Sequence, residues 1–440
     1  MTSAATPSRS PFAAVHGRLG TIEPGEMRAT LLACLYFFFL LASYFILRSV
    51  RDAVGVAAGV QNLSWLFTGT LVATILLNPV FATVVSSLPV RRFIPIVYRT
   101  FGVLLLGFVA AVYWWPESYN GWMQPAFWIW TSVFSLFVPS VFWGFMADTF
   151  HPEQGKRLFG FISVGGTLGA LAGSALTAAL AKIVGTAALM LISAAMLEIA
   201  VQVVRRFPPS FRSDTRKREE EKRPIGGSSF SGFINVVKSP YLLGICLYML
   251  LFTVGTTVLY FQQAEIVAEA YSDRESRTAF LAQIDFMVQL LTVFAQLFLT
   301  GRIIKWLGVG FTLAILPAMS IIGFGALGVT ASFAVFVAFS VLRRAGSYGF
   351  ANPAREVLFT VVRPEDKYKA KNLIDTFVYR SGDQIGAWSY RGFTALGLSM
   401  SGIALMAVPL SALWLAVGIW LGRRQASRQA SMEGEGATRV

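Results

Sequence analysis

The most constraining feature of this chain is a series of twelve apolar segments, each about as long as a helix that crosses a lipid bilayer. A helix rises ~1.5 Å per residue, so roughly 20 apolar residues cross the hydrocarbon core. Only 14% of the 440 residues are charged, too few to cover a soluble chain of this size. The sequence therefore predicts an all-α membrane protein with twelve transmembrane helices. The expected spans are 27–48, 61–87, 93–114, 123–147, 157–181, 185–204, 240–263, 279–300, 311–329, 331–351, 372–397 and 400–422.

Lysine and arginine are unevenly distributed between the two sides of these spans. With both termini on the inner side, the inner segments hold 28 of the 37 Lys and Arg residues and the outer segments hold six. Cytoplasmic loops of membrane proteins carry such an excess. The formal charge of +14 therefore indicates a topology with both termini in the cytoplasm, and we expect no nucleic-acid partner.

The longest hydrophilic stretch divides the spans into two sets of six. Its mixed charge and lack of apolar periodicity are typical of a flexible linker. Cys34-Leu35-Tyr36 in the first span matches Cys246-Leu247-Tyr248 in the seventh, at an offset of 212, and basic residues follow the second and eighth spans at a similar offset. These matches favour a parallel repeat of two six-helix halves, as in the major facilitator fold. The expected divisions are a cytoplasmic arm (1–26), a first bundle (27–204), a cytoplasmic linker (205–239), a second bundle (240–422) and a cytoplasmic tail (423–440).

Charged side chains at bilayer depth are costly and therefore mark candidate functional positions. Arg380 and Asp383 lie in the eleventh span, ~13 and ~18 Å from its inner boundary and on one helix face. Two interpretations are open for them, a structural pair that neutralises itself and a cavity-lining pair that breaks and forms during transport. Arg343 and Arg344 lie in the tenth span and point ~100° apart. We expect one of them to contact a neighbouring helix and the other to face a central cavity.

Further charges lie in the first, sixth and eighth spans. Asp285 is ~12 Å from the outer boundary of its span. Arg48, Arg51 and Asp52 share a face at the outer end of the first span, and Glu198 is ~10 Å from the inner boundary. Snorkelling of these side chains to the interface is the alternative to a functional role. The candidate substrate-binding residues are Arg343, Arg344, Arg380, Arg48 and Arg51. The candidate coupling or ion-pair residues are Asp383, Asp285, Asp52 and Glu198.

Arginines outnumber carboxylates in these spans. A cavity with spare guanidinium groups suits an anionic cargo, because guanidinium pairs bidentately with carboxylate or phosphate. The sequence contains no ATPase phosphate-binding loop, no nucleophile–histidine set and no cluster of metal ligands, so we expect no enzyme activity, cofactor or metal. Gly165, Gly169 and Gly173 repeat every four residues and predict a face on which another helix approaches closely.

Three stretches resemble the bacterial and plastid ATP/ADP translocase family, nucleotide exchangers related to the major facilitators. One is Phe142-Trp143-Gly144-Phe145-Met146-Ala147-Asp148 with Gly155-Lys156-Arg157-Leu158-Phe159-Gly160. Another is Lys367-Tyr368-Lys369-Ala370-Lys371-Asn372-Leu373-Ile374-Asp375, continuing to Arg380-Ser381-Gly382-Asp383, and the third is Arg51-Asp52. The resemblance implies a twelve-span exchanger of nucleotides in a bacterial inner membrane. Asp383 stands where the resembled family has lysine, so other organic anions stay open as cargo.

These observations together predict a multi-pass secondary transporter that works by alternating access. The expected partners are a small anionic substrate, with a nucleotide as the cargo that the resemblance implies, and the lipid bilayer; we expect a monomer. Proton-coupled movement of another organic anion, with Asp383 or Asp285 as the proton carrier, is one alternative. A non-transporting membrane receptor or assembly partner is another.

Overall fold

The computed structural model describes residues 26–87, 90–116, 119–208, 236–330, 332–362, 370–371 and 373–437, and every regular element within them is a helix. The first half of the chain contains α2 (Met27–Ala58), α3 (Val60–Ser87), α4 (Val90–Trp114), the π-helical turn η1 (Tyr119–Met123), α6 (Gln124–Thr149) and α7 (Pro152–Arg205). The second half contains α10 (Pro240–Ala270), α11 (Arg274–Phe294), η3 (Ala295–Leu299), α12 (Thr300–Thr330), α13 (Phe333–Gly346), η4 (Ser347–Ala351), α14 (Asn352–Leu358), η5 (Phe359–Val361), η6 (Ile374–Val378), α16 (Tyr379–Ala395) and α17 (Met400–Ala437).

Two of these long elements are each interrupted by a glycine. Gly185 in α7 has φ +74° and Gly308 in α12 has φ +76°, a left-handed conformation that side chains with a Cβ rarely adopt. Each glycine therefore separates two membrane-length helices. Within the described residues, eight stretches are long and apolar enough to cross a membrane, and two of them contain these breaks. The tenth and eleventh expected spans, which carry the charged residues, are also helical where they are described. The predicted all-α fold is therefore confirmed.

Two helices extend well beyond the predicted spans. Helix α2 continues to Ala58 because Asp52, Val54 and their neighbours are buried against other helices. Arg48, Arg51 and Asp52 therefore lie within a helix and not at its outer end. Helix α17 continues to Ala437, so the expected tail from residue 423 is helical through Ala437.

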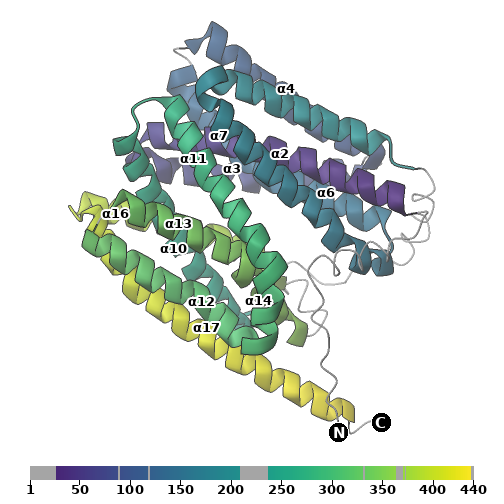
Figure 1. The fold of residues 1–440 in the computed structure, drawn as a ribbon, viewed down its shortest axis with the longest axis vertical. Coiled ribbons are helices and arrows are strands. Elements are labelled where there is room, and N and C mark those ends of the chain that lie inside the picture. Colours follow the sequence, from purple (N-terminus) through teal and green to yellow (C-terminus); the bar gives the residue numbers. More distant parts are fainter. Residues whose placement is uncertain are drawn as a thin grey trace, which may run out of the picture.

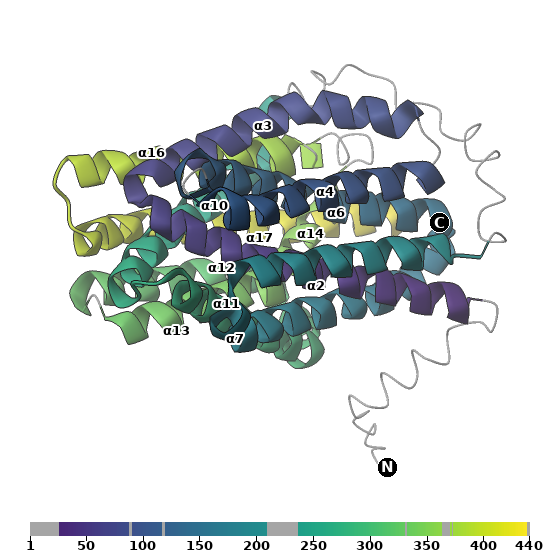
Figure 2. The same ribbon diagram turned by 90° about the horizontal axis from the view of Figure 1, so that it is seen from above.

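The helices form two groups that follow the two halves of the sequence. Figure 1 shows the first half, in purple to blue, beside the second half, in teal to yellow. Within the halves, α7 packs along α2, α17 along α12, and α16 along α10. The beginning of α2 and the end of α17 lie at the same end of the molecule in both views (Figure 1 and Figure 2). The predicted domain limits stay a prediction, since most of the linker lies outside the described residues.

The glycine face predicted in the fifth span is confirmed. A Cβ added at Gly165, Gly169 or Gly173 would lie 2.1–2.5 Å from a backbone carbonyl oxygen of α2. Helix α7 can lie this close to α2 only because these positions lack side chains. The second half has a similar close contact between helices, since Gly382 and Gly386 of α16 pack against α10.

The contacts between the halves that the structure describes are concentrated at one end of the bundle. This is the end opposite the one where α2 begins. The Ser64 hydroxyl donates to the carbonyl of Ala387 at 2.9 Å, and Thr68 donates to the Gln384 side chain at 2.9 Å. One buried hydrophobic cluster contains residues of both halves. A second cluster consists of second-half residues, from the first turns of α10 to Leu421 of α17. The halves therefore pack together at one end, and the second half has its own core at the other.

Candidate functional site

A cluster of charged residues from both halves lies where α2, α11 and α13 meet. Asp285 of α11 lies between two arginines: Oδ2 is 3.5 Å from Arg48 Nε of α2, and Oδ1 is paired with Arg344 Nη2 of α13. Arg48 Nε also lies 3.9 Å from Asp52 Oδ2. Arg51 Nη2 donates to Asp52 Oδ1 at 2.6 Å. The sequence placed these charges in three separate spans, and the fold brings them together.

Tyrosines complete this cluster. The Tyr260 hydroxyl, on α10 of the second half, donates to Asp52 Oδ1 at 3.0 Å. Tyr348 of η4 lies beside the Arg48 side chain. Thus Asp52 and Asp285 each receive partners from both halves. Sequence reasoning missed the two tyrosines because an aromatic residue in an apolar span is usually a packing residue.

The carboxylates of this cluster are more deeply buried than its arginines. The side chains of Asp285 and Asp52 are 3% and 6% exposed, whereas those of Arg48 and Arg51 are 14% exposed and that of Arg344 is 16% exposed. Three arginines face two carboxylates, which leaves one positive charge. Asp285 lies eleven residues from the start of α11, or ~16 Å into its span. The arginine side chains are therefore the more exposed members of this cluster.

Arg380 and Asp383 form the ion pair that their spacing predicted. Arg380 Nη1 lies 3.3 Å from Asp383 Oδ2, and the Thr257 hydroxyl donates to Asp383 Oδ1 at 3.1 Å. The arginine side chain is 16% exposed and the aspartate side chain 9% exposed. The pair lies on α16, just after the π-helical turn η6, a type of irregularity that is frequent at functional sites.

Arg343 and Arg344 have different surroundings, as their 100° offset predicted. Arg343 is 2% exposed, and its three hydrogen bonds go to Ser320 Oγ at 3.0 Å, Thr256 Oγ1 at 3.1 Å and the Phe252 carbonyl at 3.3 Å. Its guanidinium also lies 5.7 Å from the Phe252 ring and 5.8 Å from the Trp414 ring. Within the described residues it has no carboxylate partner. Arg343 is therefore held inside the second half, while Arg344 faces the inter-half cluster.

Glu198 lies apart from these groups, where it pairs with Arg99 of α4. Arg99 Nη2 lies 2.7 Å from Glu198 Oε1, and both side chains are more than 40% exposed. The sequence alone could not show which basic residue on another span pairs with Glu198. The exposed position fits the interface alternative weighed for this residue.

Two other groups were not predicted. The Trp65 and Trp388 rings meet at 4.9 Å, Arg391 lies over both, and its Nη1 donates to the Gln61 carbonyl at 3.1 Å. This set joins α3 to α16 at the contacting end of the halves. At the other end, Arg355 lies 3.5 Å from Asp375 and Lys371 pairs with Glu356. The only sequence signal for these groups was basic residues near span ends.

Two helical halves that meet around paired charges at mid-depth define a membrane transporter. The sequence comparison assigns the family. The model of the Major Facilitator Superfamily matches residues 25–372, most of the chain, and the chain belongs to this superfamily.

Relatives of this chain include carriers from chlamydiae. It is 27% identical to "ADP,ATP carrier protein 2" of Chlamydia pneumoniae over a match that covers 51% of this chain and 47% of that protein. It is 23% identical to "ADP,ATP carrier protein 1" of Chlamydia muridarum, with 97% of this chain and 94% of that protein covered. The first match spans about half the relative, whereas the second spans nearly all of it. The resemblance inferred from the motifs is thereby confirmed.

Solved structures that share this fold include transporters. The chain superposes on a D-xylose-proton symporter with a TM-score of 0.62 and 12% identity, over 91% of this chain and 97% of that one. It superposes on a bacterial homolog of the human lysosomal transporter Spinster with a TM-score of 0.60 and 15% identity, over 91% and 98%. At these identities the similarity establishes the fold alone.

Proposed function

We propose that this protein is a secondary active transporter that moves an organic anion by alternating access, with exchange of nucleotides as the first activity to test. The inter-half cluster carries the proposal: Arg48 and Arg51 from one half and Arg344 from the other surround two buried carboxylates with one positive charge in excess. A phosphate or carboxylate group can bind the exposed sides of these guanidinium groups. The printed names of the chlamydial relatives support a nucleotide cargo.

The arrangement of the cluster also supports a role in alternating access. Arg48–Asp285 and Asp52–Tyr260 join the halves at mid-depth, in addition to the contacts at the end where the halves pack together. An anion that binds Arg48 competes with Asp285 for this guanidinium group across the halves. Binding therefore weakens the contacts that must break before the halves separate at this end, which links cargo binding to the conformational change.

The orientation follows from the distribution of basic residues. With the termini in the cytoplasm of a bacterial inner membrane, the contacting end of the halves is the periplasmic end. The described structure then corresponds to a carrier closed toward the periplasm. We propose this localisation and a monomeric carrier.

Transport in proteoliposomes tests the proposal. We expect uptake of labelled ATP to be faster into vesicles loaded with ADP than into empty vesicles, and Arg48→Gln to reduce it at least tenfold. Arg99→Gln is the matched control, because Arg99 also pairs with a carboxylate but lies apart from the cluster. Other organic anions are assayed in parallel. Absence of flux for every anion, or transport of neutral or cationic compounds only, would contradict the proposal.

Proton-coupled transport of another organic anion is the second candidate, favoured by Asp383. This buried carboxylate is held by a single arginine and a threonine hydroxyl, so protonation would release Arg380 for an anion. An imposed proton gradient should then drive anion uptake into empty vesicles, and Asp383→Asn should abolish that drive. Anion exchange at a rate that does not depend on the proton gradient would exclude proton coupling.

A further inference from the structure

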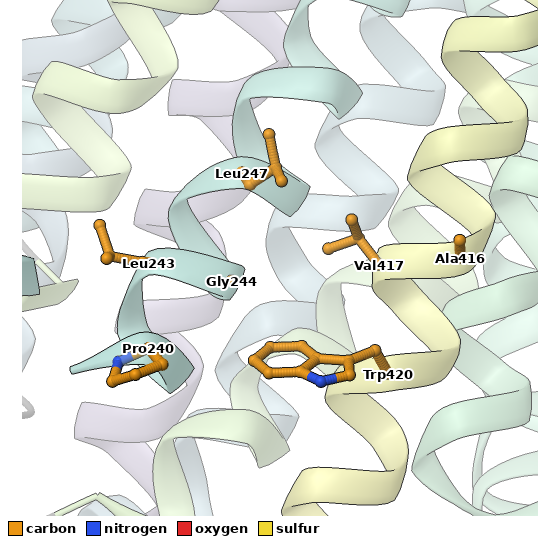
Figure 3. A pocket seen from close by; sticks show the side chains of 7 residues that line it. All are labelled: Pro240, Leu243, Gly244, Leu247, Ala416, Val417 and Trp420. Atoms are coloured by element: carbon orange, nitrogen blue, oxygen red, sulfur yellow. The ribbon is translucent and has the colours of Figure 1, made fainter.

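A groove on the surface of the second half lies between the first turns of α10 and residues 416–420 of α17. It is lined by Pro240, Leu243, Gly244, Leu247, Ala416, Val417 and Trp420 and has a volume of about 500 Å³. All of its lining residues are apolar, and Figure 3 shows the Trp420 ring crossing toward α10 beside Pro240 and Gly244. The groove is unrelated to the charged cluster at mid-depth.

The groove depends on a close approach of the tryptophan to a glycine. A Cβ at Gly244 would lie 2.3 Å from Trp420 Cζ3, so any side chain there would displace the ring. Leu243 and Leu247 are 43% and 40% exposed, and Trp420 is 37% exposed. From Pro240 to Leu247 the groove runs along ~10 Å of helix, a large part of one bilayer leaflet.

Basic residues flank the open end of the groove. The Arg424 guanidinium lies 5.8 Å from the Trp420 ring, and exposed Lys238 precedes Pro240 by two residues. Arg428 lies over the ring of Tyr241, the neighbour of Pro240, at 4.4 Å. Neither 236–247 nor 413–428 contains an aspartate or glutamate. The groove therefore combines an apolar slot with a positively charged rim.

We propose that this groove binds an anionic phospholipid, with an acyl chain along Leu243, Leu247 and Val417 and the phosphate beside Lys238 and Arg424. The slot alone would accept the acyl chain of any lipid, and the positive rim selects for net negative charge. Basic residues at a membrane surface strengthen binding of anionic lipid roughly fivefold each. The lipid belongs to the leaflet on the side of the chain termini, which is the cytoplasmic leaflet in the predicted orientation.

Native mass spectrometry of the purified protein with phosphatidylglycerol and phosphatidylcholine of identical acyl chains tests the proposal. We expect the wild type to prefer phosphatidylglycerol by at least tenfold, and the variant Lys238→Gln/Arg424→Gln to lose most of this preference. Arg302→Gln/Lys305→Gln is the matched control: it removes two positive charges from the part of α12 that precedes Gly308 and should keep the preference. Equal binding of the two lipids by the wild type, or equal loss in both variants, would overturn the proposal.

Fluorescence quenching tests where the lipid binds in a protein that keeps all of its charged residues. Phosphatidylglycerol with brominated acyl chains should quench Trp420, measured as the signal difference between wild type and Trp420→Phe, more than brominated phosphatidylcholine at the same total concentration. Filling the slot with Ala416→Phe should reduce this difference. Equal quenching by the two lipids, or binding of inorganic phosphate at the rim without quenching by lipid, would contradict an anionic phospholipid site.

Discussion

At the residue scale, the two adjacent arginines of α13 allow effects on anion binding and on protein stability to be measured separately. Arg344 is partly exposed in the inter-half cluster, whereas Arg343 is buried among neutral acceptors and two aromatic rings. We predict that Arg344→Lys weakens anion binding ten- to hundredfold, because losing a charge-assisted hydrogen bond costs about 1.5–3 kcal/mol. Arg343→Lys should lower the melting temperature and leave affinity within about threefold, because lysine lacks the planar fork that contacts three acceptors. Ligand titration and thermal unfolding of both variants measure the two effects.

These variants control for each other, since they make the same substitution at neighbouring positions. A larger affinity loss in Arg343→Lys than in Arg344→Lys would show that the cargo binds inside the second half rather than at the inter-half cluster.

The Arg380–Asp383 pair gives the second residue-scale prediction. Removing either partner leaves the other charge buried, which costs about 3 kcal/mol for a pair at this depth. Arg380→Gln and Asp383→Asn should therefore each lower thermal stability more than the double variant does. A double-mutant cycle of melting temperatures in detergent measures the coupling, with transport measured beside it. If the effects of the single variants simply add, the two side chains do not interact.

At the scale of elements, the contact between α7 and α2 depends on backbone proximity. Gly169→Leu should destabilise the protein by about 3 kcal/mol or prevent folding, because an added Cβ would lie 2.1 Å from the Phe38 carbonyl oxygen and α7 would have to move away. Gly160→Leu in the same helix is the control, since nothing lies within 4 Å of its added Cβ. Monodispersity in detergent and the melting temperature distinguish the two. A well-folded Gly169→Leu protein would show that α7 packs elsewhere.

At the scale of the whole molecule, alternating access requires the contacts between α3 and α16 to separate. Ser64 and Ala387 are joined by a hydrogen bond across the halves. Ser64→Cys/Ala387→Cys, with both native cysteines replaced by serine, should react with a short thiol crosslinker and lose transport, and cleavage of the crosslinker should restore it. Each single cysteine variant, treated with the same reagent, is the control. Full transport by the crosslinked protein would show that this end of the halves does not open.

The sequence by itself determined the features that depend on neighbouring residues. The all-helical fold follows from apolar length, because a backbone in lipid must satisfy its hydrogen bonds within each helix. The Arg380–Asp383 pair and the glycine face of the fifth span follow from spacings along a single helix. The different surroundings of Arg343 and Arg344 follow from their 100° offset, although the sequence could not say which of them faces the cluster.

Only the tertiary structure decided which charges meet between helices. Asp285 joins Arg48 and Arg344, and Asp52 meets Tyr260 from the other half. These pairings depend on the rotation and axial position of each helix, and packing contacts between helices set both. The same contacts let α2 continue past its charged residues to Ala58, because partners on other helices stabilise those charges inside the bundle. Periodicity and composition describe one helix at a time and therefore hold no information on such pairings.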